Sequence, residues 1–363
     1  MTRLCILSLL LSVATQRAMG SESMAATDST ARQGNKIIQA VKRVMDAFDD
    51  TDDMYVERPQ YECAVEFRAT RNYENFILNS EEQSIMFSPD QPIKVGPYFS
   101  WRWMSIGTTF DLKKISLFDN STKREFDFSF YSARVGADLF YRHTGNDYKL
   151  RNVQIGKNVD GTKFEDVPFD GITVGVVGAN AYYIFNHRRF SYPAAFSTGS
   201  RQKISCGSWL AGVGHTRNTL DLDFDKLESL LREHTDDEIK LDSSMMFHRV
   251  EYNDFNVSTG YAHTWVLTRD LTLSASGQAA LAYKNSHGRT DDEGYGINFG
   301  KVNLDGIGRF AVAYNNMRWY AGACIVLRTN NYHTSHFATS NIYGTFNAYI
   351  GYNFILKKEY RKK

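Results

Sequence analysis

Residues 342–355 read Ile342-Tyr343-Gly344-Thr345-Phe346-Asn347-Ala348-Tyr349-Ile350-Gly351-Tyr352-Asn353-Phe354-Ile355. The even positions are mostly apolar, and the odd positions carry mostly amides and hydroxyls. Side chains of a β-strand point alternately to opposite faces, so this stretch predicts a strand with one face suited to hydrocarbon and one suited to water. Its length is sufficient to cross a lipid bilayer.

The same alternation recurs along the chain and predicts twelve strands. The predicted segments are residues 61–69, 93–103, 104–112, 126–130, 135–142, 172–185, 204–213, 255–265, 271–284, 301–314, 318–328 and 342–355. An even number suits a closed antiparallel barrel with both termini on one side. The sequence therefore predicts an all-β fold, a closed transmembrane β-barrel of about twelve strands.

The connections between these segments alternate in length. Tight turns are predicted near residues 103, 132, 269 and 316, and long polar loops at residues 79–92, 113–123, 145–170, 214–253, 285–299 and 329–340. Outer-membrane barrels have short periplasmic turns and long extracellular loops, so both termini are expected in the periplasm. Trp101, Trp103, Trp265 and Trp319 lie near the short turns, as expected of an aromatic girdle at a membrane interface.

Composition narrows the class of protein. The chain has 363 residues, a formal net charge of +1 and a mean hydropathy of -0.41. A nucleic-acid-binding protein is normally clearly basic, so no nucleic-acid partner is expected. A helical membrane protein is also disfavoured, because no apolar run of about 18 residues occurs outside the N-terminus.

The ends of the chain predict export. Arg3, the apolar residues 4–13 and Ala18-Met19-Gly20 are typical of a secretory signal peptide covering residues 1–20. Residues 21–58 are then a periplasmic N-terminal segment with a short amphipathic helix at residues 36–48. Residues 59–357 form the outer-membrane barrel, and residues 358–363 form a basic periplasmic tail.

Neither a disulfide framework nor a metal site is indicated. Cys63, Cys206 and Cys324 remain after removal of the signal, and they are odd in number and far apart. The acidic residues 49–53 lack the spacing and the glycine of a calcium-binding loop, so we expect a solvated turn. No metal and no cofactor are expected.

Several segments carry a family resemblance. Tyr182-Tyr183-Ile184-Phe185-Asn186-His187-Arg188-Arg189-Phe190-Ser191-Tyr192, Ala194-Ala195-Phe196, Arg201-Gln202-Lys203 and Gly207-Ser208-Trp209 resemble a family of uncharacterised Bacteroidota outer-membrane proteins, a domain of unknown function. Asp52-Asp53-Met54-Tyr55-Val56 and Gly136-Ala137-Asp138-Leu139-Phe140-Tyr141 support the resemblance, which covers roughly residues 45–357. It implies an outer-membrane barrel and supplies no activity, ligand or catalytic residue.

The face predicted to point inward is charged on nearly every strand. Arg102, Asp138, Arg142, Arg309 and Arg318 are the main candidates for contact with a solute in the lumen. Buried charges must be paired or hydrated, so two interpretations remain open. The charges either line a channel for small polar solutes or form an ion-pair lattice that closes the barrel.

The connection at residues 186–203 departs from the short-turn rule. His187, Arg188 and Arg189 in it are candidates for binding a phosphate or carboxylate, since arginine offers paired donors for oxyanions. The alternative is that the connection folds back into the barrel mouth and pairs its arginines with lumenal carboxylates. Pro193 and the nearby aromatic residues indicate a packed segment.

A catalytic role has one weak set of candidates. His333 and Ser335 form a His-x-Ser pair, and Asn341 in the next strand is in a position to orient the histidine, as in an outer-membrane phospholipase. No nucleophile elbow, HExxH sequence or phosphate-binding loop is present. The chain is therefore not expected to be an enzyme.

Three functions follow in order of preference: a passive conduit or binding barrel for small polar or charged solutes, a closed structural or assembly barrel, and an outer-membrane lipid hydrolase. The expected partners are outer-membrane lipid, the barrel assembly machinery and, for an open lumen, a small polar solute. Phe224, Leu227, Leu230 and Leu231 have near-helical spacing and predict a short surface helix in the long acidic loop.

Overall fold

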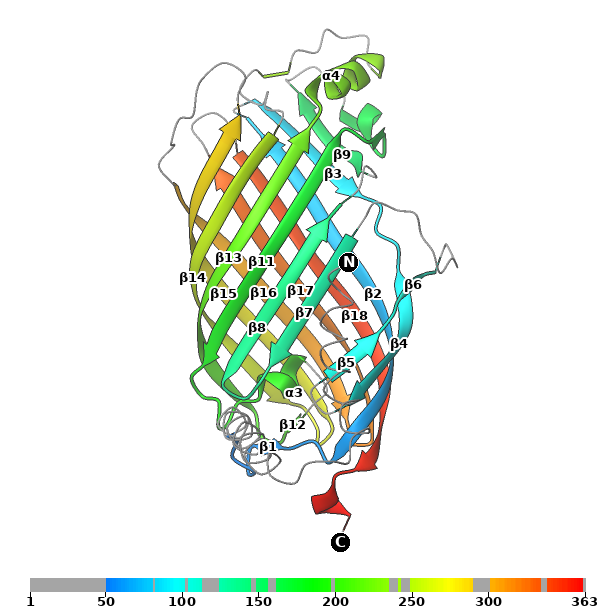
Figure 1. Cartoon of the computed structure of the whole chain (residues 1–363), viewed down its shortest axis with the longest axis vertical. Helices are drawn as coiled ribbons and strands as arrows, with labels where there is room; N and C mark the ends of the chain where they lie inside the picture. Colours follow the sequence, from blue (N-terminus) through cyan, green and yellow to red (C-terminus); the bar gives the residue numbers. More distant parts are fainter. Residues whose placement is uncertain are drawn as a thin grey trace, which may run out of the picture. The chain divides into compact units, whose positions relative to one another are not determined.

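The computed structural model describes residues 50–80, 82–101, 104–112, 124–144, 148–155, 161–196, 200–234, 241–242, 249–289, 301–333 and 338–361. The predicted signal peptide, the predicted N-terminal helix, Arg102 and Ser335 lie outside this set. The described residues all belong to one unit, Asp50–Lys363. Figure 1 shows that this unit is built mainly of long, tilted β-strands.

Sixteen strands form one antiparallel sheet. They are β2 (Tyr61–Asn79), β3 (Gln83–Pro89), β4 (Lys94–Trp101), β5 (Met104–Gly107), β6 (Phe110–Asp111), β7 (Arg124–Tyr131), β8 (Val135–His143), β9 (Tyr148–Ile155), β10 (Pro168–Phe169), β11 (Ile172–Ile184), β13 (Cys206–Leu222), β14 (Arg249–Val266), β15 (Leu271–Arg289), β16 (Lys301–Asn315), β17 (Trp319–His333) and β18 (Ala338–Leu356). The hydrogen-bonded order is β10-β9-β3-β2-β18-β17-β16-β15-β14-β13-β11-β8-β7, with β4 paired to β2, β5 and β6.

The remaining elements are short. β1 (Val56–Glu57) and β12 (Arg201–Gln202) pair with each other in a separate two-stranded sheet. The helices of the described residues are η1 (Gly161–Phe164), α3 (Tyr192–Phe196), α4 (Phe224–Glu233) and η3 (Lys358–Tyr360). None of them has the length and apolar character needed to span a membrane.

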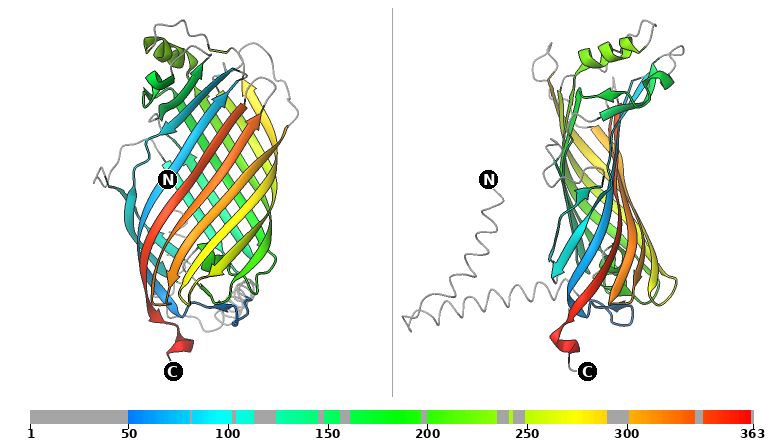
Figure 2. Two further views of the ribbon diagram at one scale, coloured as in Figure 1. Left: turned by 180° about the vertical axis from the view of Figure 1, so that it is seen from behind. Right: turned by 90° about the vertical axis from the view of Figure 1, so that its right-hand side faces the viewer.

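Side-chain contacts between distant strands show that the sheet rolls around an interior. Arg309 on β16 pairs with Asp138 on β8, although β15, β14, β13 and β11 lie between them in the hydrogen-bonded order. Arg142 on β8 donates a hydrogen bond to Thr345 Oγ1 on β18 over 3.1 Å, with six strands between them in that order. Figure 2 shows the curvature of the sheet from two further sides.

The predicted strand positions agree with the structure. Each of the twelve predicted segments overlaps a strand over most of its described residues, with the third divided into β5 and β6. Two predicted loops are wrong, because residues 79–92 and 145–170 contain β3, β9 and β10. Three others are shorter than predicted, because β13, β14, β15, β17 and β18 extend into residues 214–253, 285–299 and 329–340. The apolar side chains of β3 and β9, such as Phe87 and Leu150, are fully buried. These strands were not predicted, because the prediction relied on apolar faces that point outward.

The described strands form no closed ring. β7 ends the hydrogen-bonded path on one side, and β5 and β6 pair with β4 on the other. The structure therefore establishes an all-β, rolled antiparallel sheet.

The predicted alternation of faces is confirmed along the long strands. Phe310 and Ile350 point outward and are each 54% exposed, whereas the adjacent Arg309 is 0% exposed. Ser274 and Thr264, which were assigned to the inward face, are also buried. The sheet thus covers its polar side chains and exposes its apolar ones.

A hydrophobic cluster fills the interior at the end where the long loops lie. The first half of β2 pairs with β4 and the second half with β3, which in turn pairs with β9. α4 packs Leu227 and Leu231 into this cluster, against residues of β3, β9 and β11. The side chain of Asp223 accepts a hydrogen bond from Lys226 N over 3.0 Å and caps the helix. The predicted surface helix is confirmed, and its apolar face is covered by the protein's own strands.

Candidate functional site

The interior is crossed by a buried ion-pair cluster about midway along the strands. Asp138 on β8 pairs with Arg309 on β16 and, over 3.1 Å, with Arg328 on β17. Tyr131 donates a further hydrogen bond to Asp138 over 3.3 Å. Asp138 and Arg309 are 2% and 0% exposed, so one carboxylate joins two opposite walls out of contact with bulk solvent.

A second cluster lies between β14, β15 and β16, nearer the long-loop end. The ammonium group of Lys284 lies 3.4 Å from Asp254 and 3.2 Å from Asp305. It also donates hydrogen bonds to the side chain of Asn330 and to the carbonyl of Asn331. Buried charges are tolerated when they are paired and hydrogen-bonded in this way.

Arg142 connects β8 to the far wall. Besides its hydrogen bond to Thr345, its guanidinium carbon lies 5.2 Å from the ring centre of Tyr343. Thr345 donates to Asn72 on β2 over 3.2 Å. These contacts extend the lattice across a third level of the interior.

The buried charges of the described residues balance. The described buried residues include five carboxylates and five cations, namely Glu66, Glu74, Asp138, Asp254 and Asp305, and Arg142, Arg201, Lys284, Arg309 and Arg328. Two of them pair outside this set, Glu66 with Arg68 and Arg201 with Glu57 and Asp270. A channel that selects ions normally shows an excess of one sign along its wall, and these buried groups show no such excess.

At the end with the short turns, residues 186–196 and 200–203 pack against the sheet, and we call them the plug segment. Phe190, Tyr192 and Ala195 in it are buried and pack against Tyr182 and Leu210 of the wall. The ring of Tyr192 lies 5.9 Å from the guanidinium carbon of Arg309, and its hydroxyl donates to Ser276 over 3.4 Å. The segment packs into the mouth of the sheet, as its aromatic residues predicted.

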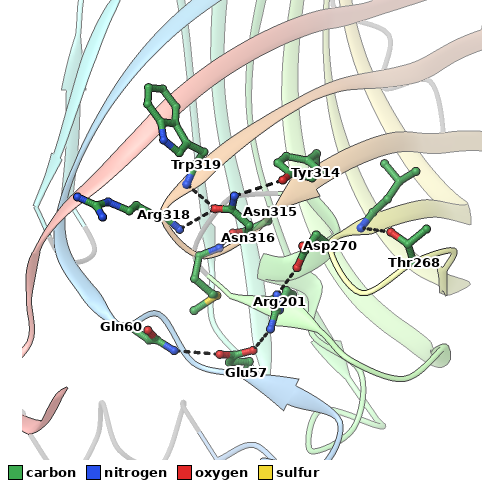
Figure 3. A network of polar contacts seen from close by, with 12 residues as sticks. Glu57, Gln60, Arg201, Thr268, Asp270, Tyr314, Asn315, Asn316, Arg318 and Trp319 are labelled. Carbon is green, nitrogen blue, oxygen red and sulfur yellow. Dashed lines mark hydrogen bonds and ion pairs between the residues drawn. The ribbon is translucent and has the colours of Figure 1, made fainter. Parts of the chain in front are cut away.

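Arg201 fastens the plug segment to two neighbours, as Figure 3 shows. It pairs with Glu57 on β1 and with Asp270 in the turn between β14 and β15. Gln202 beside it is fully buried and accepts a hydrogen bond from Ser191 N over 2.9 Å. The backbone of Lys203 donates to Tyr55 over 2.7 Å. Residues 50–58 and the plug segment are therefore held together.

The three candidates in the plug segment are not in the interior. Arg188 is exposed and lies 3.6 Å from Asp50, and Arg189 lies over the ring of Tyr55 at 5.2 Å. The ring of His187 is 6.1 Å from that of Tyr183 on the outer surface. The prediction that these arginines pair with lumenal carboxylates is wrong.

The buried arginine of the plug segment is Arg201, which pairs with Glu57 on β1 and Asp270 in a turn and which sequence reasoning noted only as part of a family segment. Its two partners are far away in sequence, so no local pattern identifies it.

The predicted position of Arg318 is also wrong. It was assigned to the lumen, but it is exposed in the turn between β16 and β17, where Nε donates to Tyr352 Oη over 2.9 Å. This hydrogen bond raises the pKa of Arg318 above its usual value.

The structure describes only part of the proposed catalytic set. Asn341 is buried and lies opposite Asn330 across the β17–β18 pair, whereas the strand partner of His333 is Ala338. Ser335 lies outside the described residues. Among the described residues, no group of three or more potential ligands for a metal ion is found, and Cys63, Cys206 and Cys324 are free thiols.

We predict that Asp138→Asn destabilises the folded protein by about 3–5 kcal/mol, because it leaves two buried guanidinium groups without their carboxylate. Denaturant titration of the refolded protein measures the change. The control is Asp170→Asn, which breaks an exposed pair with Lys226 at 2.6 Å and is expected to cost less than about 1 kcal/mol. Equal effects of the two variants would show that the interior pairs do not hold the walls together.

Searches against known proteins give one informative match. Residues 50–354 match a family model described as "Domain of unknown function (DUF4421)". No curated protein matches the chain.

Solved structures resemble the chain only distantly. The outer membrane protease OmpT from Escherichia coli is 8% identical, with 82% of this chain and 98% of that chain covered and a TM-score of 0.36. The translocator domain of the autotransporter NalP from Neisseria meningitidis is 10% identical, with coverage of 91% and 100% and a TM-score of 0.31. The toluene transporter TodX from P. putida is 8% identical, with coverage of 82% and 91% and a TM-score of 0.21. Similarity this low supports no inference about function.

The family match spans most of the chain and includes every strand of the rolled sheet except the last two residues of β18. The chain therefore belongs to the DUF4421 family, a domain of unknown function.

Proposed function

We propose that the protein is a closed β-barrel of the bacterial outer membrane whose interior is sealed, and that it serves as a structural or assembly protein. The observation that carries the proposal is the inverted distribution of side chains: the outer surface is apolar and the interior is charged. The sealed interior is supported by the ion-pair lattice and by packed residues at both ends.

The apolar outer surface favours lipid as its surroundings. Val257, Leu281 and Val302 are 66%, 62% and 68% exposed, and their neighbours across the sheet are similar. Soluble proteins rarely expose apolar patches larger than a few hundred Å². A band of this kind around the whole sheet is stable in hydrocarbon and is expected to aggregate in water.

The edges of this apolar band support the same placement. Near the short turns, Trp209, Tyr261, Trp265 and Trp319 are between 43% and 64% exposed, as expected of an interfacial girdle. Towards the long loops, the outward face carries the ion pair of Arg217 and Glu251 at 2.8 Å. Phe255 and Trp265 on β14 are ten residues apart. With a rise of about 3.4 Å per residue and a strand tilt of about 40° from the barrel axis, their separation along that axis is roughly 26 Å. That height matches the apolar band of outer-membrane barrels.

Closure follows from the cost of unpaired backbone groups in lipid. Each backbone N–H or C=O without a partner costs several kcal/mol there, so open sheet edges are not tolerated. We infer that β5 and β6 pair with β7 in the membrane. The wall then has twelve strands: β2, β4, β5 with β6, β7, β8, β11 and β13 to β18. The short turns and both ends of the barrel domain lie in the periplasm, and the barrel assembly machinery is the expected folding partner.

The lattice favours a sealed barrel over the passive conduit that the sequence favoured. A conduit requires a water-filled path, and the side chains of Arg309 and Lys284 have no exposed surface. The hydrophobic cluster under α4 and the plug segment close the two ends of the same interior.

A gated conduit is the second candidate, and one observation favours it. The seal at the short-turn end is a separate segment held by Arg201 and by residues 50–58, whereas the opposite seal combines α4, β3 and β9 with residues of the wall strands β2, β11 and β13. Displacing that segment is the simplest route to an open barrel.

We predict that Ile350→Arg destabilises the protein in lipid vesicles by about 2–4 kcal/mol, the cost of arginine near the bilayer midplane. Denaturant unfolding in vesicles gives the value. Ser229→Arg on the exposed face of α4 is the control, with an expected change below about 0.5 kcal/mol. Ser276→Arg is expected to be costly as well, because Ser276 is 4% exposed and has no room beside Tyr192. If Ile350→Arg and Ser229→Arg behave alike, the outer face is not in lipid.

Planar-bilayer recording tests the seal. We expect no unit conductance from the wild type, because the lattice leaves no continuous water path. Arg201→Gln removes the ion pairs that hold the plug segment, and Arg217→Gln is a matched change of an exposed arginine at the other end. Conductance in Arg201→Gln alone would favour the gated conduit. Conductance in the wild type would contradict the sealed barrel.

A further inference from the structure

The turn between β16 and β17 presents one arginine on the outer surface. The amide of Asn316 accepts hydrogen bonds from the backbone N–H groups of Arg318 and Trp319 over 3.1 and 2.7 Å. The carbonyl of Arg318 accepts a hydrogen bond from Asn353 N over 2.8 Å. Met317 has a φ of 72°, in the left-handed region, and its N–H donates to the Asn315 side chain over 2.8 Å. The turn is therefore fixed by side-chain hydrogen bonds.

The side chain of Arg318 lies among aromatic residues on the lipid-facing side. Its guanidinium carbon is 5.4 Å from the ring centre of Tyr352, to whose hydroxyl Nε donates. Trp319 is 52% exposed, and its ring lies 4.7 Å from that of Tyr352. Figure 3 shows Arg318 pointing away from the Arg201 contacts. Both terminal nitrogens of the guanidinium remain available for a ligand, because the hydrogen bond to Tyr352 uses Nε.

The chain that follows β18 is basic. β18 ends at Leu356, four residues beyond Tyr352, and residues 357–361 contain Lys357, Lys358 and Arg361 with one acidic residue, Glu359. Among the side chains that the structure describes, no carboxylate lies within ion-pair distance of these three cations or of Arg318. Arg361 turns back to donate to the carbonyl of Leu356 over 2.6 Å. The basic residues therefore follow directly on the end of β18.

We propose that Arg318, Tyr352 and Trp319 form a binding site for the phosphate headgroup of an anionic phospholipid in the periplasmic leaflet. The proposal rests on the membrane placement proposed above and adds a specific lipid contact to it. The guanidinium donates paired hydrogen bonds to phosphate oxygens, which is the geometry arginine favours. The rings of Trp319 and Tyr352 lie at the interface level, and the exposed Ile350 below them contacts the acyl chains.

An anionic lipid fits this site better than a zwitterionic one. A basic side chain near a membrane surface gains about 1 kcal/mol from anionic lipid, whereas phosphatidylcholine carries its own compensating cation. Lys357, Lys358 and Arg361 add to the attraction without needing a defined geometry.

The experiment uses the full chain refolded into bilayers of phosphatidylcholine, with and without phosphatidylglycerol. Native mass spectrometry then counts the phosphatidylglycerol molecules that stay bound after extraction. We expect the wild type to retain phosphatidylglycerol in preference to phosphatidylcholine, and Arg318→Gln to lower its occupancy roughly fivefold. Arg318→Lys keeps the positive charge but loses the paired donors of the guanidinium. Its phosphatidylglycerol occupancy is therefore expected to lie between those of the wild type and Arg318→Gln.

The matched control is Arg217→Gln, an exposed arginine at the opposite edge of the apolar band that pairs with Glu251. Equal phosphatidylglycerol occupancy in Arg318→Gln and Arg217→Gln would overturn the proposed lipid site. A wild type that enters bilayers but holds both lipids equally would also overturn it, while leaving the membrane placement intact. A wild type that fails to enter either bilayer would overturn the membrane placement and the site together.

Discussion

The interior of the protein depends on the pairing of Asp138 with Arg309 and Arg328. Asp138 comes from β8, which is far in the sheet from the neighbouring strands β16 and β17, and the three groups meet only because the sheet rolls. Removing a carboxylate from such a cluster is expensive, since two buried cations lose their counter-ion. The lattice therefore specifies which walls face each other. Arg142 and Lys284 make further polar contacts between strands in other parts of the interior. The buried charges of the described residues sum to zero.

The outer face follows from the same alternation that builds the lattice. Each strand that points a charged residue inward points an apolar residue outward, so one pattern produces both the ion-paired interior and the exposed apolar band. The two ends of the interior are packed in different ways. At one end α4, β3 and β9 contribute to a hydrophobic cluster, and at the other the plug segment is held by aromatic packing and the Arg201 ion pairs.

Local pattern predicted the strands well, because the alternation around Phe310 and Ile350 is a property of neighbouring residues. It missed β3 and β9, whose apolar residues face a protein core instead of the outer surface. It also missed Arg201, since Glu57 and Asp270 reach it only through the fold. Arg318 was assigned to the inward face by extending the alternation of β17 past its end. The turn at Met317 reverses the chain there, so the alternation no longer applies.

The most direct test of the sealed interior uses a cysteine that the protein already contains. Cys324 lies on the inward face of β17, 8% exposed, between Ala311 and Asn347 on the neighbouring strands. In a variant whose Cys63 and Cys206 are replaced by alanine, a charged, membrane-impermeant thiol reagent is applied to the protein folded in lipid vesicles. The sealed barrel predicts that Cys324 stays unmodified until denaturant unfolds the protein. Rapid modification of Cys324 in the folded protein would contradict it and show that water and solutes reach the centre of the barrel.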